Sequence, residues 1–257
     1  MNSNHSMFIE VKSCDAVVND MQKLVLILFL PLVLVILLLD HLCPGACLVR
    51  SVKLIILIFL FSLALFIRKK NGFDYGEKKL LRLAFFLVVL GDFLFVTSLH
   101  ISPLQEKTIF VGIISFLAAY ACLIIAFQKS RSPGIAHAVA ALPVLALFVP
   151  VLIHYTPWVS GPTFYGALLF GVVLSGMAWR AICTIIEGYY ALHVALWLAL
   201  AGYLMFISDL AVGLAVLNPV FSGIFVPWLQ NIIWSSFIGA WIIIVLVLAE
   251  KDFLKPY

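Results

Sequence analysis

The segment LRLAFFLVVLGDFLFVTSL, residues 81–99, places one carboxylic acid, Asp92, inside a run of hydrocarbon side chains. The segment LALAGYLMFISDLAVGLAVL, residues 198–217, does the same with Asp209. Each run is long enough to cross the ~30 Å hydrocarbon core of a bilayer as a helix. A charged side chain near the bilayer centre costs about 2.5–3.5 kcal/mol on insertion scales. We therefore take these two acids as candidate functional residues.

The composition of the whole chain is that of an integral membrane protein. Of its 257 residues, 65% are hydrophobic and 11% are charged, and the mean hydropathy is +1.18. Soluble domains are about 25% charged and cannot bury this much apolar surface. The length suits one helix bundle without a second globular domain, and we expect no nucleic-acid partner.

Apolar runs of spanning length recur along the chain, and they lack the alternation that barrel strands show. We therefore predict an all-α integral membrane protein with a single bundle of about eight transmembrane helices. The bundle is expected to occupy residues 22–249, between an N-terminal segment 1–21 and a tail 250–257. The predicted spans lie near residues 22–40, 50–67, 80–99, 108–127, 134–153, 163–186, 191–217 and 224–249.

The basic residues predict the orientation of this bundle. The run Arg68-Lys69-Lys70 lies between the second and third spans, on the side that also holds most other basic residues. Only Arg50, Lys53 and Lys107 lie on the opposite side in an eight-span arrangement. Because basic residues are concentrated in cytoplasmic loops, both termini are expected in the cytoplasm. We expect the protein in the bacterial inner (cytoplasmic) membrane.

Polar residues within the spans are expected to meet in the outer half of the bundle. At 1.5 Å per residue, Asp92 lies roughly 18 Å and Asp209 roughly 27 Å from the cytoplasmic end of its helix. Lys53 enters from outside one turn into the second span, and the last span begins with Gln230 and Asn231 near the same depth. These positions favour a functional cavity, and the alternative is that each group forms a helix–helix hydrogen bond worth about 1 kcal/mol.

No metal or cofactor is expected. His41, His100 and His154 lie at outer helix ends without the spacing of a zinc motif. The cysteines form no metal pattern either, and Cys43 and Cys47 are either ordinary thiols or a strained disulfide.

Three short motifs resemble the YhhN family of eight-helix lysoplasmalogenases and their bacterial relatives. They are Gly91-Asp92 in the third span, Met177-Ala178-Trp179-Arg180-Ala181 in the sixth, and Phe206-Ile207-Ser208-Asp209 in the seventh. The resemblance runs from about Lys53 to about Leu248. It implies cleavage of the vinyl-ether bond of lysoplasmalogens, which gives a fatty aldehyde and a glycerophospho-head group. It also implies that Asp92, Asp209 and Lys53 match the family's two acids and its lysine.

The chain departs from the family pattern in its fourth, seventh and last spans; in the seventh, the Gly and Phe ahead of Ser208-Asp209 are not in their usual register. Tyr120 stands in the fourth span where the family usually carries a histidine. In the last span, Ser236-Phe237 and Ala240 replace a Tyr-Tyr and Gln pattern. These differences leave open which lysolipid is the substrate and whether the chain is active.

The chemistry of a vinyl ether suits two carboxyl groups in different environments. Protonation at carbon generates an oxocarbenium ion, which a nearby negative charge stabilises and water captures. Our hypothesis makes Asp92 the general acid and Asp209 the stabilising anion, although the sequence also allows the reverse. Lys53, Ser208, Gln230 and Asn231 are the candidates for binding the phosphate or the glycerol hydroxyl of a lysophospholipid drawn from the surrounding membrane lipids.

Two other interpretations remain. In a small proton-coupled transporter, Asp92 and Asp209 would relay protons, because intramembrane acids often have this role. The chain shows no internal repeat or matching pair of broken helices, which transporters often have. A non-catalytic lipid-binding protein related to the enzyme is the third possibility, and the departures from the family pattern favour it.

Overall fold

The computed structural model describes residues 20–67, 75–98, 105–128, 134–222 and 224–250, which form helices joined by turns. No strand occurs among these residues. In chain order the helices are α1 (Asp20–Leu42), α2 (Cys47–Phe66), α3 (Tyr75–Ser98), α4 (Gln105–Phe127), α5 (Ile135–Ala140), α6 (Leu142–Tyr155), α7 (Gly161–Glu187), α8 (Leu192–Leu217) and α9 (Pro227–Leu248).

The predicted all-α membrane fold is confirmed. Segments of α2 (Leu48–Phe66) and α4 (Thr108–Phe127), and the whole of α7, α8 and α9, are long and apolar enough to cross a membrane. Shorter apolar stretches lie in α1 (Phe29–Leu42) and in α6. The orientation of the bundle and the assignment of residues 1–21 and 250–257 to the cytoplasm stay predictions, and these two segments lie mostly outside the described residues.

The predicted fifth span, 134–153, forms two helices instead of one. α5 ends at Ala140, and α6 begins at Leu142 with Pro143 in its first turn. Proline lacks a backbone N–H, so it is accommodated most easily in a first helical turn, although α6 also contains Pro150 in its interior. The eight predicted spans therefore correspond to nine helices in the described part of the chain.

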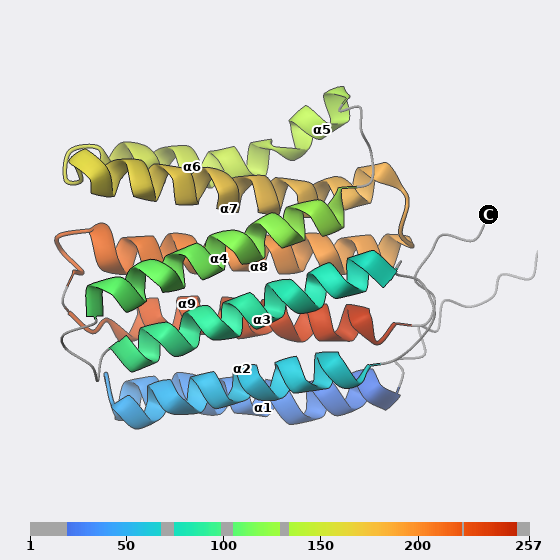
Figure 1. Ribbon diagram of the computed structural model, residues 1–257, viewed down its shortest axis with the longest axis horizontal. Helices are drawn as coiled ribbons and strands as arrows, with labels where there is room; N and C mark the ends of the chain where they lie inside the picture. The colour runs from blue at the N-terminus through green and yellow to red at the C-terminus, as the bar shows by residue number, and fades with distance from the viewer. Residues whose placement is uncertain (1–19, 68–74, 99–104, 129–133, 223, 251–257) are drawn as a thin grey trace, which may run out of the picture.

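The helices lie side by side along the long axis of the bundle (Figure 1). α1 and α2 form one side, α6 and α7 form the other, and α3, α4, α8 and α9 lie between them (Figure 1). α3 packs along α4, while α9 packs against α8, α1 and α2. The last helix is thus surrounded by helices from both halves of the sequence.

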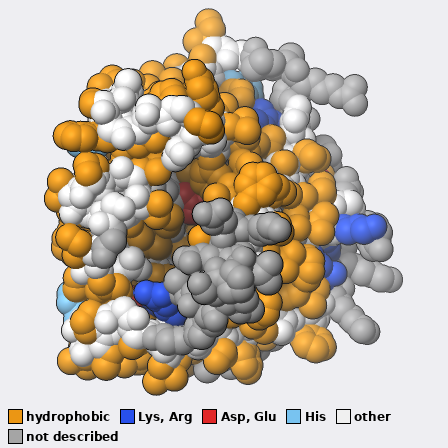
Figure 2. Space-filling view, turned by 60° about the vertical axis from the view of Figure 1, so that its left-hand side comes forward, with side chains coloured by type: hydrophobic (Ala, Val, Ile, Leu, Met, Phe, Trp, Pro, Cys, Tyr) orange, Lys and Arg blue, Asp and Glu red, His pale blue; other side chains and the backbone are white. Residues whose placement is uncertain are grey.

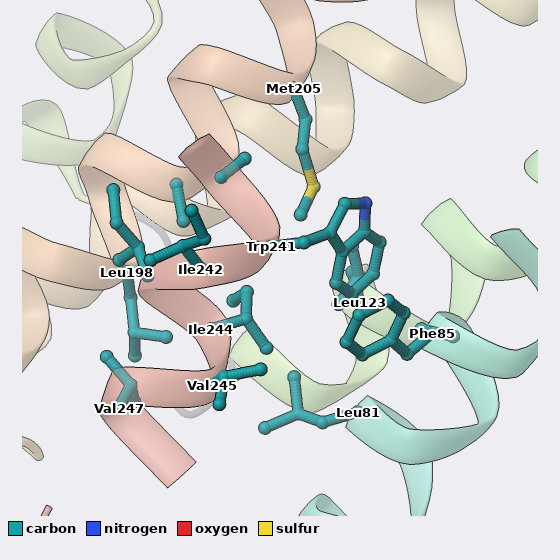
Figure 3. Packing of buried hydrophobic residues seen from close by; sticks show 14 of the residues in the cluster. Leu81, Phe85, Leu123, Leu198, Met205, Trp241, Ile242, Ile244, Val245 and Val247 are labelled. Carbon is teal, nitrogen blue, oxygen red and sulfur yellow. The ribbon is translucent and has the colours of Figure 1, made fainter. Parts of the chain in front are cut away.

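The core lies along the second half of α9. Every residue from Ala240 to Ala249 is buried. The Trp241 ring stacks on Phe85 of α3 with ring centroids 4.2 Å apart and an interplanar angle of 19°. Met205 of α8 and Leu123 of α4 belong to the same cluster (Figure 3). A helix that is apolar all round is buried on all sides, and here protein covers α9.

Arg82 joins α3 to the end of α2. Its guanidinium donates hydrogen bonds to the carbonyl oxygens of Ala64 at 3.1 Å and Ile67 at 2.7 Å. The last carbonyls of a helix have no partner within the helix, so a cation there satisfies them. This contact fixes the position of α3 relative to α2.

Gly202 allows α8 to approach α7 closely. A Cβ atom at this position would lie 2.4 Å from the Cβ of Ala181 in α7, far inside van der Waals contact. Small residues at such crossings are how membrane helices gain packing energy. Asp209 lies on the same helix, so this contact also determines the position of that acid.

We predict that Gly202→Ala lowers the free energy of unfolding by about 1–3 kcal/mol, the range typical of overpacked sites. Gly166→Ala is the matched control, because nothing lies within 4 Å of a Cβ at Gly166. It should be neutral or stabilise the α7 helix by up to about 1 kcal/mol. Unfolding of both purified variants by denaturing detergent measures the difference. Equal stability of the two would contradict the close α7–α8 contact.

Candidate functional site

The two intramembrane acids come together with a tyrosine. The Tyr120 hydroxyl, on α4, donates a hydrogen bond to Oδ2 of Asp209 on α8. Asp92, on α3, interacts electrostatically with both Asp209 and Tyr120. The consecutive helices α3 and α4 and the distant helix α8 therefore contribute one side chain each to a single polar cluster, which we call the acid cluster.

The two carboxyl groups of the acid cluster have different surroundings. Asp209 accepts the hydrogen bond from Tyr120, whereas Oδ2 of Asp92 is buried without a hydrogen-bond partner among the described residues. Both side chains are only partly buried overall. One oxygen of Asp92 thus lies where the described residues supply no hydrogen-bond donor.

Aromatic rings and a glycine shape the walls of the acid cluster. A Cβ at Gly91 would lie 2.7 Å from the Phe116 ring, so only glycine lets α3 and α4 approach this closely beside Asp92. Phe170 of α7 packs edge-on against the Tyr120 ring, with centroids 5.9 Å apart. In the space-filling view of the end where α3 and α8 finish, an acidic side chain lies at the base of a hollow (Figure 2).

Ser208 joins α8 to α9. Its hydroxyl donates a hydrogen bond of 3.0 Å to the carbonyl oxygen of Ile233, and the side chain is buried. Because its proton is already engaged, Ser208 holds the two helices together next to Asp209. Its place in a substrate site stays a prediction.

A second polar group surrounds Lys53 near the start of α2. The Lys53 ammonium donates to both carboxylate oxygens of Asp40 on α1, at 2.8 and 2.7 Å, and both side chains are 2% exposed. It also lies 4.6 Å from the centre of the Trp234 ring on α9. The Trp234 indole in turn donates to Gln230 at 3.2 Å. We call these four residues the lysine cluster.

The lysine cluster lines a cavity of about 160 Å³ between α1, α2 and α9. Gln230 and Lys53 both line this cavity, and their role in substrate binding stays a prediction. Asn231 is placed differently, because its side chain pairs with His41 of α1 at 2.7 Å. The residues lining the cavity are Asp40, Gly45, Ala46, Arg50, Lys53, Phe225, Gln230 and Trp234.

A row of aromatic rings connects the two clusters. The centroids of Trp234 and Phe237 are 5.9 Å apart, those of Phe237 and Phe116 are 6.3 Å apart, and those of Phe116 and Tyr120 are 6.3 Å apart. Lys53 and the two acids are therefore not one continuous set of hydrogen bonds. They are separate polar groups on opposite sides of this aromatic row.

Comparison with known proteins identifies the family. A model of the YhhN family matches residues 45–248, most of the chain. The chain belongs to the YhhN family. A search of curated proteins and a search of solved structures each found no match. Membership suggests a lysoplasmalogenase-like membrane protein.

The match to the YhhN family includes some members of both clusters. Lys53, Asp92, Tyr120 and Asp209 lie within the matched residues, whereas Asp40 lies before them. Sequence reasoning missed Asp40, which stands at the end of an apolar run and resembles an ordinary loop residue. It also missed the bond from Tyr120 to Asp209, because a tyrosine in an apolar span usually belongs to the core. The available signal for Asp40 was the presence of an acid and a lysine on the two sides of the short turn between α1 and α2.

The longest YhhN motif, Met177–Ala181, lies in α7 away from both clusters. Trp179 donates a hydrogen bond of 2.7 Å to the carbonyl oxygen of His137 in α5. Arg180 pairs with Glu187 at 2.8 Å, and His137 lies 3.6 Å from the same carboxylate oxygen. These contacts hold the short α5 helix against α7, so the motif has a structural role in this chain.

The buried pair of Lys53 and Asp40 allows a test of the lysine cluster. Lys53→Met leaves the Asp40 carboxylate buried without a partner, so we expect a loss of about 3–5 kcal/mol in the free energy of unfolding. Adding Asp40→Leu removes that carboxylate and should recover most of the lost free energy of unfolding. Unfolding curves of the single and double variants measure both values. A single variant as stable as the unmodified protein would rule out the pair.

Proposed function

We propose that this YhhN protein hydrolyses the vinyl-ether bond of lysoplasmalogens or a related lysolipid, giving a fatty aldehyde and a glycerophospho-head group. The observation that carries the proposal is the meeting of Asp92 and Asp209 in unequal surroundings. Acid hydrolysis of an enol ether needs a proton donor, and a second carboxyl group that remains an anion stabilises the oxocarbenium ion that forms. Family membership supports the same reaction class.

The contacts favour Asp92 as the proton donor. A hydrogen bond from Tyr120 stabilises the charged form of Asp209, and two neighbouring carboxyl groups in apolar surroundings are not both charged. Asp92 is then the protonated acid, and one oxygen of its carboxyl group has no hydrogen-bond partner among the described residues. In the proposed first step it transfers this proton to C2 of the vinyl ether, and positive charge develops on C1 and the ether oxygen.

Asp209 completes the reaction in this proposal. Its negative charge stabilises the oxocarbenium ion, water adds to C1, and the proton that this water loses passes to the carboxylate. The resulting hemiacetal breaks into the aldehyde and the glycerol hydroxyl. Proton exchange between the two acids restores the starting state, so one water molecule is consumed in each cycle.

The substrate suits a bundle of this kind. A single-chain lipid keeps its tail among apolar side chains and its head group at the polar end, where Lys53, Gln230 and Asn231 remain the proposed binding residues. Such a lipid reaches the site from the membrane, which we propose is a bacterial cytoplasmic membrane. The transporter interpretation predicts transport driven by an ion gradient, whereas the hydrolase needs no gradient.

Aldehyde release from a lysoplasmalogen by the purified protein in detergent tests the function. Asp92→Asn and Asp209→Asn should each reduce kcat by about 10²–10⁴, the usual contribution of a positioned acid or base. The matched control is Glu250→Gln, since Glu250 lies just beyond the far end of α9, where it is 4.0 Å from His193. If the unmodified protein releases no aldehyde, or if folded Asn variants keep full activity, the proposal is wrong.

Tyr120→Phe should separate the hydrogen bond from the packing of the ring. The phenyl group keeps the contacts to Phe116 and Phe170, but Asp209 loses its donor. Since a hydrogen bond to a charged group contributes about 1.5–3 kcal/mol, we expect kcat to fall about 10- to 100-fold with KM nearly unchanged. A rise in KM alone would place Tyr120 against the bound lipid instead of Asp209.

A further inference from the structure

The cavity beside the lysine cluster contains one cation whose charge is not neutralised. Lys53 is neutralised by Asp40, which uses both of its carboxylate oxygens for that contact. Arg50 also lines the cavity, is only partly buried, and forms no ion pair or side-chain hydrogen bond among the described residues. Lys53 is close enough to Arg50 for the two cations to repel each other. The cavity therefore presents a net positive charge.

The end of α2 adds to this positive potential. Gly45 and Ala46, which line the cavity, immediately precede the first turn of α2, and no side chain caps that turn. The first N–H groups of a helix have no partner inside the helix and carry partial positive charge. An anion in the cavity would meet these groups as well as the guanidinium of Arg50.

The size and the walls of the cavity indicate which anion fits. Its volume of about 160 Å³ is close to that of an engineered cavity of about 150 Å³ that binds benzene. That space holds a tetrahedral phosphodiester together with adjoining carbon atoms. Phe225 and Trp234 supply apolar walls for those carbons.

We propose that this cavity binds the phosphodiester of the lysolipid head group, with Arg50 as its ionic partner. The assignment deepens the proposed function and rests on it. An arginine fork matches two phosphate oxygens at once, and such bidentate contacts are among the strongest hydrogen bonds in proteins.

The same geometry predicts that the ammonium end of the head group is not recognised. Both oxygens of Asp40 already bind Lys53, and the Lys53 ammonium already lies against the Trp234 ring. Among the described residues that line the cavity, Asp40 is the only carboxylate, so no second acid is present there for ethanolamine or choline. Substrates with these two head groups should have KM values within about threefold of each other, because the phosphate contact that they share sets the affinity.

Kinetics on Arg50 variants test the site. Arg50→Gln should raise KM about 10- to 100-fold for both head groups, with kcat within about twofold, since the contact is equal in the ground and transition states. Arg50→Lys keeps the charge but loses the forked guanidinium, so its KM should lie between those of the unmodified protein and Arg50→Gln. The matched control is Lys23→Gln, which removes one exposed cation near the opposite end of α1. An unchanged KM for Arg50→Gln overturns the assignment.

A binding measurement separates this inference from the proposed function. Glycerophosphoethanolamine should raise the Tm of the unmodified protein but not that of Arg50→Gln, whether or not the protein releases aldehyde. Absence of such a shift in the unmodified protein overturns the head-group site even if hydrolysis is observed. An equal shift with inorganic phosphate would identify a site for free phosphate and also overturn the lipid assignment. A shift with the phosphodiester alone supports it.

Discussion

The structure depends on the need to satisfy charged groups inside an apolar bundle. Desolvation of a carboxylate or an ammonium costs several kcal/mol per ion, so each buried charge requires a partner within reach. Lys53 and Asp40 meet this need with each other, and Arg180 and Glu187 do so near the other end of the long helices. Asp92 and Asp209 do not, because two carboxyl groups cannot neutralise each other, and the hydroxyl of Tyr120 is bonded to Asp209 alone. The acid cluster is thus an energetically unfavourable arrangement of side chains within the fold.

Tight packing of the surrounding helices maintains that arrangement. Gly91 lets α3 approach α4, Gly202 lets α8 approach α7, and the Ser208 hydroxyl holds α8 to α9. These contacts use backbone, small side chains and one hydroxyl, so they add no charge near the acids. Close packing is the main source of association between membrane helices, and here it opposes the repulsion between the carboxyl groups.

Sequence patterns predicted the helices and the two acids because both signals are local. A run of apolar residues defines a span, and an acid within it is conspicuous whatever its neighbours are. The partners were harder to predict, because they depend on which helix faces which. Tyr120 was taken only as a departure from the family pattern, yet its hydroxyl binds Asp209. Asp40 stands at a helix end, where charged residues are ordinary, and only the fold brings it to Lys53. The break at Ala141 also lies beyond hydropathy, since both α5 and α6 are apolar.

The aromatic row from Trp234 to Tyr120 explains how two polar groups of different character share one bundle. A lysine ammonium beside either acid would neutralise the charge of that acid. The difference in protonation between Asp92 and Asp209, on which acid catalysis relies, would then be lost. Phe237 and Phe116 stand between Trp234 and Tyr120, so the charge of Lys53 is directed to Asp40 instead. The acids then respond mainly to each other and to Tyr120. A substrate that extends from one group to the other would place its phosphate by the cations and its ether bond by the acids, which is the order of parts found in a lysoplasmalogen.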